Sequence, residues 1–204
     1  MSLADAFLLG PGLSEEASAQ KLAQMLLLSS VGVPFVIDAM SVTGLWDQQR
    51  MLTRRGGNLV ITPHPGEMAA LTGLSKEHIN AEPLRVAKEV AGHLQCIVVL
   101  KGSATVIAQP DGPTYHYKGG GVGLATSGSG DVLAGALVGL VARGAKPIEA
   151  AIWSVYLHGE AGRRLARRVG PLGFLARELP AEIPGLMAEL GPPPVVPPVS
   201  RRSV

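Results

Sequence analysis

The sequence has one cysteine among its 204 residues, which excludes an internal disulfide and is typical of a protein from a reducing, cytoplasmic setting. Cys96 lies in the apolar run CIVVL, where a small buried side chain is a more ordinary interpretation than a reactive thiol. Aromatic residues make up only 4%, which argues against a platform on which nucleic-acid bases stack. We therefore expect no nucleic-acid partner and a cytoplasmic location.

Long apolar runs are also missing. The longest uncharged one, VLAGALVGLVA at 132–142, is far shorter than the roughly 20 residues of a membrane span. The opening residues MSLADAFLLGPG have neither the basic region nor the apolar stretch of a signal peptide. These absences predict a protein that does not interact with membranes.

What is present is a globular composition, with 47% apolar and 17% charged residues and a net charge of +2. The length predicts a single domain over 1–190. The tail at 191–204, GPPPVVPPVSRRSV, has no core-forming pattern and is predicted to be disordered. Four clustered arginines at helical spacing indicate a solvated helix face, with a phosphate or nucleic-acid patch as the alternative: Arg163, Arg164, Arg167 and Arg168.

Short apolar runs alternate with longer amphipathic stretches along the chain, which predicts an α/β fold with a mostly parallel central sheet flanked by helices. The expected strands are 6–9, 33–37, 59–61, 97–100 and a hairpin of 106–108 with 114–117 around PDG. The expected helices are 15–29, a stretch from Asp38 to Arg55, 66–71, 82–93, 131–143, 147–168 and about 174–190.

Polar and glycine-rich residues follow the strands where each one ends: GPG at 10–12, Asp38, TPHPGE at 62–67 and LKGSAT at 100–105. In open α/β sheets, ligands bind beyond the carboxyl ends of the strands. Residues 124–135, LATSGSGDVLAG, add a glycine-rich turn followed by a helix. Backbone N–H groups at such a helix start bind anions, and Asp131 in the first turn could act as a base toward a hydroxyl. Asp131 alone is equally well explained as an ordinary helix-start acid.

Three segments together carry a resemblance: ITPHPGEMAALTG, VVLKGSATVIAQPDG and GLATSGSGDVLAGALVGLVARG. In this order and spacing they resemble the ADP/ATP-dependent NAD(P)H-hydrate dehydratase family of the ribokinase-like superfamily, over nearly all of residues 4–190. GPGL at 10–13 and PLGFLARELPAEIP at 171–184 also look like family segments. The resemblance implies a ribokinase-like layered fold, here shortened at its N-terminal side.

The resemblance also implies a reaction, in which a nucleotide phosphorylates the ring hydroxyl of NAD(P)H hydrate and elimination restores NAD(P)H. It implies ADP or ATP as phosphoryl source, Mg²⁺ as cofactor, and NAD(P)H hydrate and an adenine nucleotide as partners. The resemblance implies that Asp131 is the base, that Ser129 and Gly130 belong to the anion hole, and that Glu67 lies near Mg²⁺. The implied hydrate contacts are Gly12, His64 and Asp131. The implied nucleotide contacts are Lys101, Gly102, Ser103, Ala104, Thr105 and Gly130.

Each of these residues has a simpler explanation. His64 could be an exposed turn residue and Lys101 a surface lysine. Glu67 could be a helix-start acid that completes a cap with His64 or Thr62, and Asp38 the cap of the helix after its strand. The chain also departs from the family pattern, with Met40 where a second acid is common and Ser127 where glycine is expected.

Three hypotheses follow. The first is a dehydratase acting on NAD(P)H hydrates, and the second is a small-molecule kinase of the same superfamily, whose phosphorylated product would be stable. The third is a non-catalytic nucleotide-binding module left by truncation. The chain starts at what would be a middle strand of the family fold, and the sheet edge this would expose favours a homo-oligomer.

Overall fold

The computed structural model describes residues 4–13, 15–29, 32–55 and 57–191. Its sheet has six strands in sequential order: β1 (Phe7–Leu9), β2 (Phe35–Ile37), β3 (Leu59–Ile61), β4 (Ile97–Leu100), β5 (Thr105–Ala108) and β6 (Tyr115–Tyr117). The first four are parallel, whereas β5 and β6 continue the sheet as an antiparallel hairpin. The predicted α/β class and mostly parallel sheet are confirmed.

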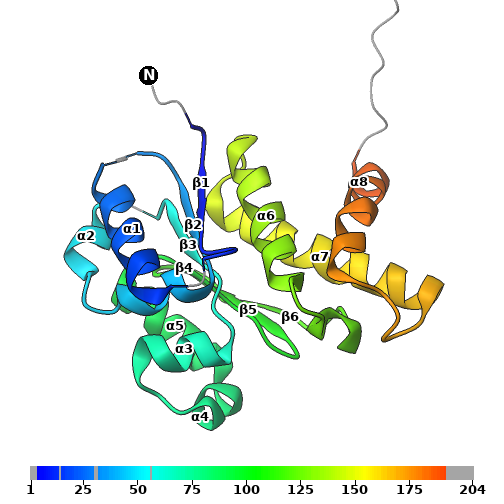
Figure 1. Ribbon diagram of the computed structural model, residues 1–204, viewed down its shortest axis with the longest axis horizontal. Coiled ribbons are helices and arrows are strands. Elements are labelled where there is room, and N and C mark those ends of the chain that lie inside the picture. The colour runs from blue at the N-terminus through cyan, green and yellow to red at the C-terminus, as the bar shows by residue number, and fades with distance from the viewer. Residues whose placement is uncertain (1–3, 14, 30–31, 56, 192–204) are drawn as a thin grey trace, which may run out of the picture.

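One face of the sheet is covered by the helices that connect the parallel strands. They are α1 (Glu16–Ser29), α2 (Gln49–Thr53), α3 (Pro65–Thr72), α4 (Lys76–Ala81) and α5 (Pro83–Leu94). Because right-handed crossovers between strands in sequential order all fall on the same side, these helices share one core with the sheet (Figure 1). Phe35 and Ile37 of β2 point into this core.

The opposite face is covered by two helices that follow the hairpin, α6 (Ser129–Ala142) and α7 (Pro147–Val169). The alternate residue of each strand, such as Val36 of β2 and Val60 of β3, packs there, as the period of two in a strand requires. α8 (Leu179–Leu190) packs against α7 at the far end (Figure 1). The fold is therefore a three-layer α/β/α arrangement, in which both faces of the central strands β2, β3 and β4 are buried.

The structure corrects two expected elements. The stretch from Asp38 to Arg55 is not one helix but two 3₁₀ turns, η1 (Ala39–Ser41) and η2 (Thr43–Leu45), followed by the short α2. Gly44 weakens a helix there, and a Cβ at Gly44 would lie 2.7 Å from the Gln20 side chain on α1. The segment before α5 forms a separate helix, α4, because Gly73 ends α3 in a left-handed conformation and Ser75 caps the next helix.

Smaller differences occur toward the C-terminus. A 3₁₀ turn, η3 (Val122–Ala125), precedes α6, and the expected helix over 174–190 is a 3₁₀ turn, η4 (Ala176–Glu178), continued by α8. The predicted disordered tail falls almost wholly at 192–204, outside the described residues. No helix in the described part of the chain is long and apolar enough to cross a membrane.

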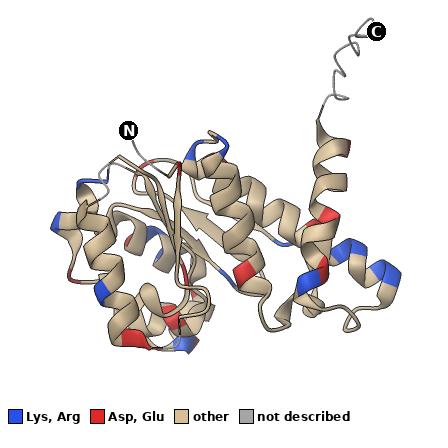
Figure 2. Cartoon of the chain, turned by 45° about the horizontal axis from the view of Figure 1, so that its top comes forward, with Lys and Arg blue, Asp and Glu red and all other residues tan. Residues whose placement is uncertain are grey.

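The clustered arginines lie on the C-terminal half of α7, where basic and acidic segments of the chain lie close together (Figure 2). Arg163 pairs with Glu160 at 3.0 Å, Arg168 pairs with Glu182 of α8 at 3.0 Å, and Arg164 pairs with Glu189 of α8. Three of the four cations are thus matched by carboxylates, two of them on the neighbouring helix. This geometry favours the solvated helix face over a phosphate patch.

The glycine at the end of β1 allows a close approach of two strand ends. Gly10 has φ +125°, and a Cβ there would lie 1.9 Å from the backbone oxygen of Asp38. Gly12 has φ +77°, and no described residue lies within 4 Å of a Cβ placed there. We predict that Gly10→Ala lowers the free energy of unfolding by about 3 kcal/mol or more, through strain plus overlap, and Gly12→Ala by only about 1 kcal/mol, through strain alone. Urea unfolding of both variants measures this, and equal losses would contradict it.

Candidate nucleotide and substrate site

The carboxyl ends of β2, β3 and β4 meet in a buried polar cluster around Asp38. Asp38 is 2% exposed, and its Oδ1 accepts hydrogen bonds from Thr62 Oγ1 at 2.6 Å and Lys101 Nζ at 2.7 Å. Its side chain makes no capping hydrogen bond to η1, so the interpretation of Asp38 as a helix cap is wrong. A buried carboxylate needs such partners because an unpaired charge is costly in the protein interior.

Lys101 links this cluster to the start of α6. Its side chain is only 18% exposed, which corrects the alternative of a surface lysine. A Cβ at Gly130 would lie 3.2 Å from Lys101 Nζ and 4.0 Å from Asp38 Oδ2. A side chain at position 130 would therefore press on the ion pair, and glycine lets the helix start approach it.

The N-terminus of α6 offers open backbone donors. Gly128 precedes the helix with φ +83°, a left-handed conformation suited to glycine. Val132 N–H donates to Gly128 O and Ser129 N–H donates to Thr126 O. Among the described residues, the N–H groups of Gly130 and Asp131 have no acceptor. Two open amides at the positive end of a 14-residue helix, beside a lysine, form a site suited to an anion.

A cavity of about 560 Å³ opens on one side of this helix start. It is lined by the β4–β5 connection, the glycine-rich segment 119–121, the first turn of α6 and the middle of α7. Its size is within the range of small-molecule and cofactor sites. Of the predicted residues it brings together Lys101, Gly102, Ser103, Thr105, Ser129 and Gly130.

The remaining predicted residues lie outside the lining of this cavity. Asp131 is exposed in the first turn of α6, and Gly12 lies in the open turn after β1. His64 and Glu67 are at the start of α3, and Ala104 is in the loop before β5 without facing the cavity. The structure thus divides the predicted set into residues that line the cavity and residues outside its lining.

His64 and Glu67 form a reciprocal cap on α3. His64 Nδ1 accepts from the N–H groups of Gly66 and Glu67 at 2.9 and 3.1 Å, and Glu67 Oε2 accepts from His64 N–H at 2.8 Å. Glu67 Oε2 also lies 3.8 Å from Lys101 Nζ. The cap that we gave as the simpler explanation of Glu67 is present.

These contacts leave Glu67 poorly suited to Mg²⁺, because its carboxylate already serves a backbone donor and faces a cation. Among the described residues, no group of three or more His, Cys, Asp or Glu side chains could hold a metal ion. Mg²⁺ often keeps its waters and takes phosphate oxygens as ligands, with few protein groups. We therefore assign no step of the reaction to a metal held by Glu67, and that role stays a prediction.

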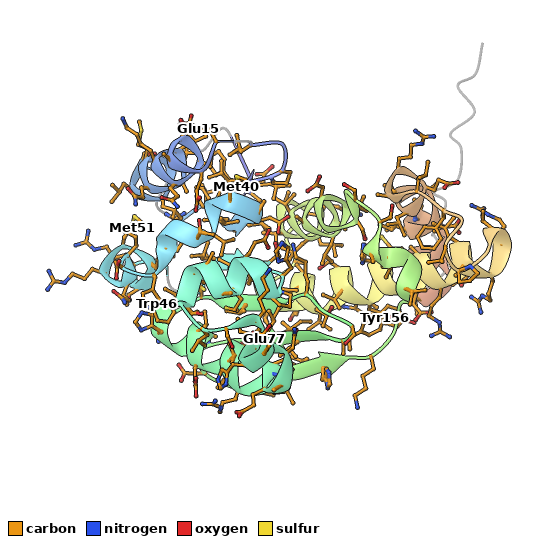
Figure 3. All side chains as sticks on the ribbon, turned by 60° about the horizontal axis from the view of Figure 1, so that its bottom comes forward. Glu15, Met40, Trp46, Met51, Glu77 and Tyr156 are labelled. Atoms are coloured by element: carbon orange, nitrogen blue, oxygen red, sulfur yellow. The ribbon has the colours of Figure 1, made fainter. Side chains whose placement is uncertain are left out.

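Two residues of the cavity wall were missed by the sequence interpretation. Tyr117 on β6 donates from Oη to Glu160 Oε1 at 3.0 Å and meets the ring of Tyr156, labelled in Figure 3, edge to face. Burial raises the pKa of Tyr117. Gly159 leaves space for this ring, since a Cβ there would lie 2.3 Å from it. The glycine directly after a histidine in YLHGEAG was the available signal.

His158 is the second missed residue. It reaches from α7 to the start of α6, with Nε2 at 2.9 Å from Ser129 Oγ and 3.0 Å from Ser129 O. Burial, and to a smaller extent the charge of Lys101, lowers the pKa of His158 to about 4, although the hydrogen bond to the Ser129 carbonyl opposes this. His158 is therefore neutral at pH 7.

Comparison with known proteins identifies the family to which this chain belongs. The family model for NAD(P)H-hydrate dehydratase matches residues 1–185. An ADP/ATP-dependent NAD(P)H-hydrate dehydratase of Bacillus subtilis, co-crystallized with ATP and Mg²⁺, superposes with a TM-score of 0.83 at 32% identity, covering 92% of this chain and 65% of that one. The fold is that of the ribokinase-like proteins, as expected. The chain belongs to the NAD(P)H-hydrate dehydratase family.

Curated relatives agree with this assignment. An ADP-dependent (S)-NAD(P)H-hydrate dehydratase of Xanthomonas campestris is 40% identical over 190 residues, which are 93% of this chain and 64% of the relative. A bifunctional NAD(P)H-hydrate repair enzyme of Moorella thermoacetica is 42% identical over 186 residues, which are 91% of this chain and 35% of the relative. The chain thus spans less than two thirds of the length of these relatives.

The lowered pKa of His158 predicts a loss of stability in acid. Because the unfolded imidazole binds a proton at about pH 6.5 and the folded one at about 4, the folded state loses stability as the pH falls from 6.5 toward 4. From pH 7 to pH 5 this group should cost roughly 2 kcal/mol of unfolding free energy. Urea unfolding of the wild type and His158→Gln at both pH values measures it. An equal decline in both proteins would contradict the prediction.

Proposed function

We propose that this chain carries out the nucleotide-dependent dehydration of NAD(P)H hydrate to NAD(P)H, with ADP or ATP as the phosphoryl source. The observation that carries the proposal is the start of α6, where the open N–H groups of Gly130 and Asp131, the Lys101 ammonium and the Asp131 carboxylate lie together beside a cavity of nucleotide size. Membership of the dehydratase family supports the choice of substrate.

The nucleotide would lie in the cavity, with its phosphates toward the helix start. Lys101 and the loop at 102–105 would border the phosphates, and Ser129 and Gly130 would form part of the anion hole. Charge developing on the transferred phosphoryl group would be stabilised by the helix N-terminus and by the lysine, which are fixed before the nucleotide binds. Ion pairing with Asp38 keeps the ammonium in place.

The hydrate would lie on the other side of the helix start, against Asp131, His64 and Gly12. Asp131 would accept the proton of the ring hydroxyl while the hydroxyl oxygen attacks the terminal phosphorus of the nucleotide. The nucleotide, shortened by one phosphate, would then leave. Phosphate would then leave with the C–O bond electrons as a neighbouring ring carbon loses a proton, which restores the ring double bond of NAD(P)H. Homo-oligomerisation and the cytoplasmic location remain predictions.

The first test is absorbance at 340 nm after the purified chain is mixed with NADH hydrate, Mg²⁺ and either ADP or ATP. A nucleotide-dependent rise is expected because elimination regenerates the reduced nicotinamide ring. A stable phosphorylated product without the rise would indicate the kinase alternative. Nucleotide binding without turnover would indicate the non-catalytic module.

Asp131→Asn should lower turnover in this assay by about a hundredfold or more, since the amide cannot accept the hydroxyl proton. Its affinity for ADP, measured by calorimetry, should stay within about threefold of the wild type because the backbone donors are unchanged. Asp111→Asn, in the exposed turn between β5 and β6, is the matched control and should change neither quantity. Full turnover in Asp131→Asn would remove it as the base.

Lys101→Ala should weaken ADP binding by about tenfold, through loss of a charge-assisted contact with the phosphates. Lys146→Ala, which removes an exposed lysine at the start of α7, is the control and should bind ADP like the wild type. Because Lys101→Ala also leaves Asp38 without its cation, circular dichroism must first establish that the variant is folded. Unchanged affinity in a folded variant would place Lys101 outside the nucleotide site.

A further inference from the structure

A single ring nitrogen of His158 on α7 is hydrogen-bonded to Ser129 at the start of α6. His158 Nε2 lies 2.9 Å from the hydroxyl oxygen of Ser129 and 3.0 Å from the carbonyl oxygen of the same residue. Both side chains line the cavity next to Gly130 and Lys101. The proposed function gives the imidazole no role, although it is the neighbour that determines which way the Ser129 hydroxyl points.

The carbonyl contact determines the tautomer of His158. A carbonyl oxygen can only accept a hydrogen bond, so a nitrogen 3.0 Å from it must carry a hydrogen. A bare Nε2 would instead direct its lone pair at the oxygen. A neutral imidazole has one N–H, and the lowered pKa keeps His158 neutral at pH 7, so the proton is on Nε2 and Nδ1 is bare.

This tautomer determines what the Ser129 hydroxyl can do. Since Nε2–H is the donor, Ser129 Oγ is the acceptor, and its own O–H remains available to a further acceptor. Within the described part of the chain, the hydroxyl has no hydrogen-bond partner besides His158. The backbone N–H of Ser129 is already bonded to Thr126 O, so the hydroxyl is the donor that this residue has left.

We infer that His158 is a positioning residue that holds the Ser129 hydroxyl as a hydrogen-bond donor toward a phosphate oxygen of the bound nucleotide. This inference rests on the proposed function, because it requires a phosphate at the start of α6. Ser129 then adds a side-chain donor to the amides of Gly130 and Asp131. The hydroxyl lies at the cavity side of the helix start, where the phosphates would meet it.

A double-mutant cycle in ADP affinity, measured by calorimetry, tests this coupling. His158→Leu and Ser129→Ala should each weaken ADP binding by about tenfold, the effect of one hydrogen bond to a charged group. Because both remove the same donor, the double variant should bind about as weakly as either single one. Losses that multiply to about a hundredfold, or wild-type affinity in folded His158→Leu, would overturn the proposal.

Two further variants separate positioning from a purely structural role. His158→Gln keeps an N–H donor at the end of the side chain and should bind ADP within about threefold of the wild type. His116→Gln, on the exposed part of β6, makes the same chemical change away from the site and should have no effect. A tenfold loss in a folded His158→Gln would show that the donor does not account for the role of His158.

Imidazole ¹⁵N NMR of the wild type at pH 7 reads the tautomer without any variant or nucleotide. We expect the His158 proton on Nε2. A proton on Nδ1 would overturn the inference even if His158→Leu proves unable to fold. If the wild type shows the Nε2 tautomer but binds no ADP, the proposed function fails and the phosphate role of Ser129 fails with it. If it binds ADP while the cycle shows no coupling, only the inference about His158 fails.

Discussion

The ion pair between Asp38 and Lys101 is the interaction on which the site depends. It joins the ends of β2 and β4, and Thr62 at the end of β3 adds a second donor to the same carboxylate oxygen. Because the pair is buried, each charge needs the other, since either one alone would be costly where water is excluded. Three strand ends are thereby held in one position relative to each other, and the start of α6 rests on the pair through Gly130.

This arrangement determines how positive charge is presented to a ligand. Asp38 offsets much of the Lys101 charge, so an anion at the helix start would be attracted by a partly neutralised lysine together with directed N–H groups. Such donors act at short range and in fixed directions, which suits the discrimination of a phosphoryl group in a particular position. A neutral His158 fits the same pattern, because in the described part of the chain its hydrogen-bond partners include no carboxylate that could balance the charge of an imidazolium.

Local patterns in the sequence predicted most of the framework. The strands 59–61 and 97–100 were predicted to the residue, because short runs rich in β-branched residues and bounded by turn residues are typical of strands. The segment between Asp38 and Arg55 was predicted wrongly, since its two 3₁₀ turns depend on packing against α1 in addition to the weak helix propensity of Gly44. α4 was missed although Gly73, Ser75 and Pro83 mark its limits.

The candidate site shows the same division between local and long-range information. Glycine-rich turns before a helix have a local signature, so Gly130 and Asp131 could be singled out from the sequence. The partner of Asp38 could not, because Lys101 is 63 residues away and the pairing exists only when the three parallel strands β2, β3 and β4 are aligned. The contact of His158 with Ser129, 29 residues away along the chain, depends on how α6 and α7 pack together, which no periodicity of the sequence encodes.

The position of Asp131 follows from the same helix start. In an α-helix, successive residues point about 100° apart, so Ser129 and Asp131 at the first and third positions of α6 face different directions. Ser129 is buried against His158 on the cavity side, whereas Asp131 is exposed. One turn of helix thus places the proposed anion donors and the proposed base on different sides of α6. The proposed phosphoryl transfer would need this separation, because a carboxylate on the cavity side would repel the phosphates of a nucleotide bound there.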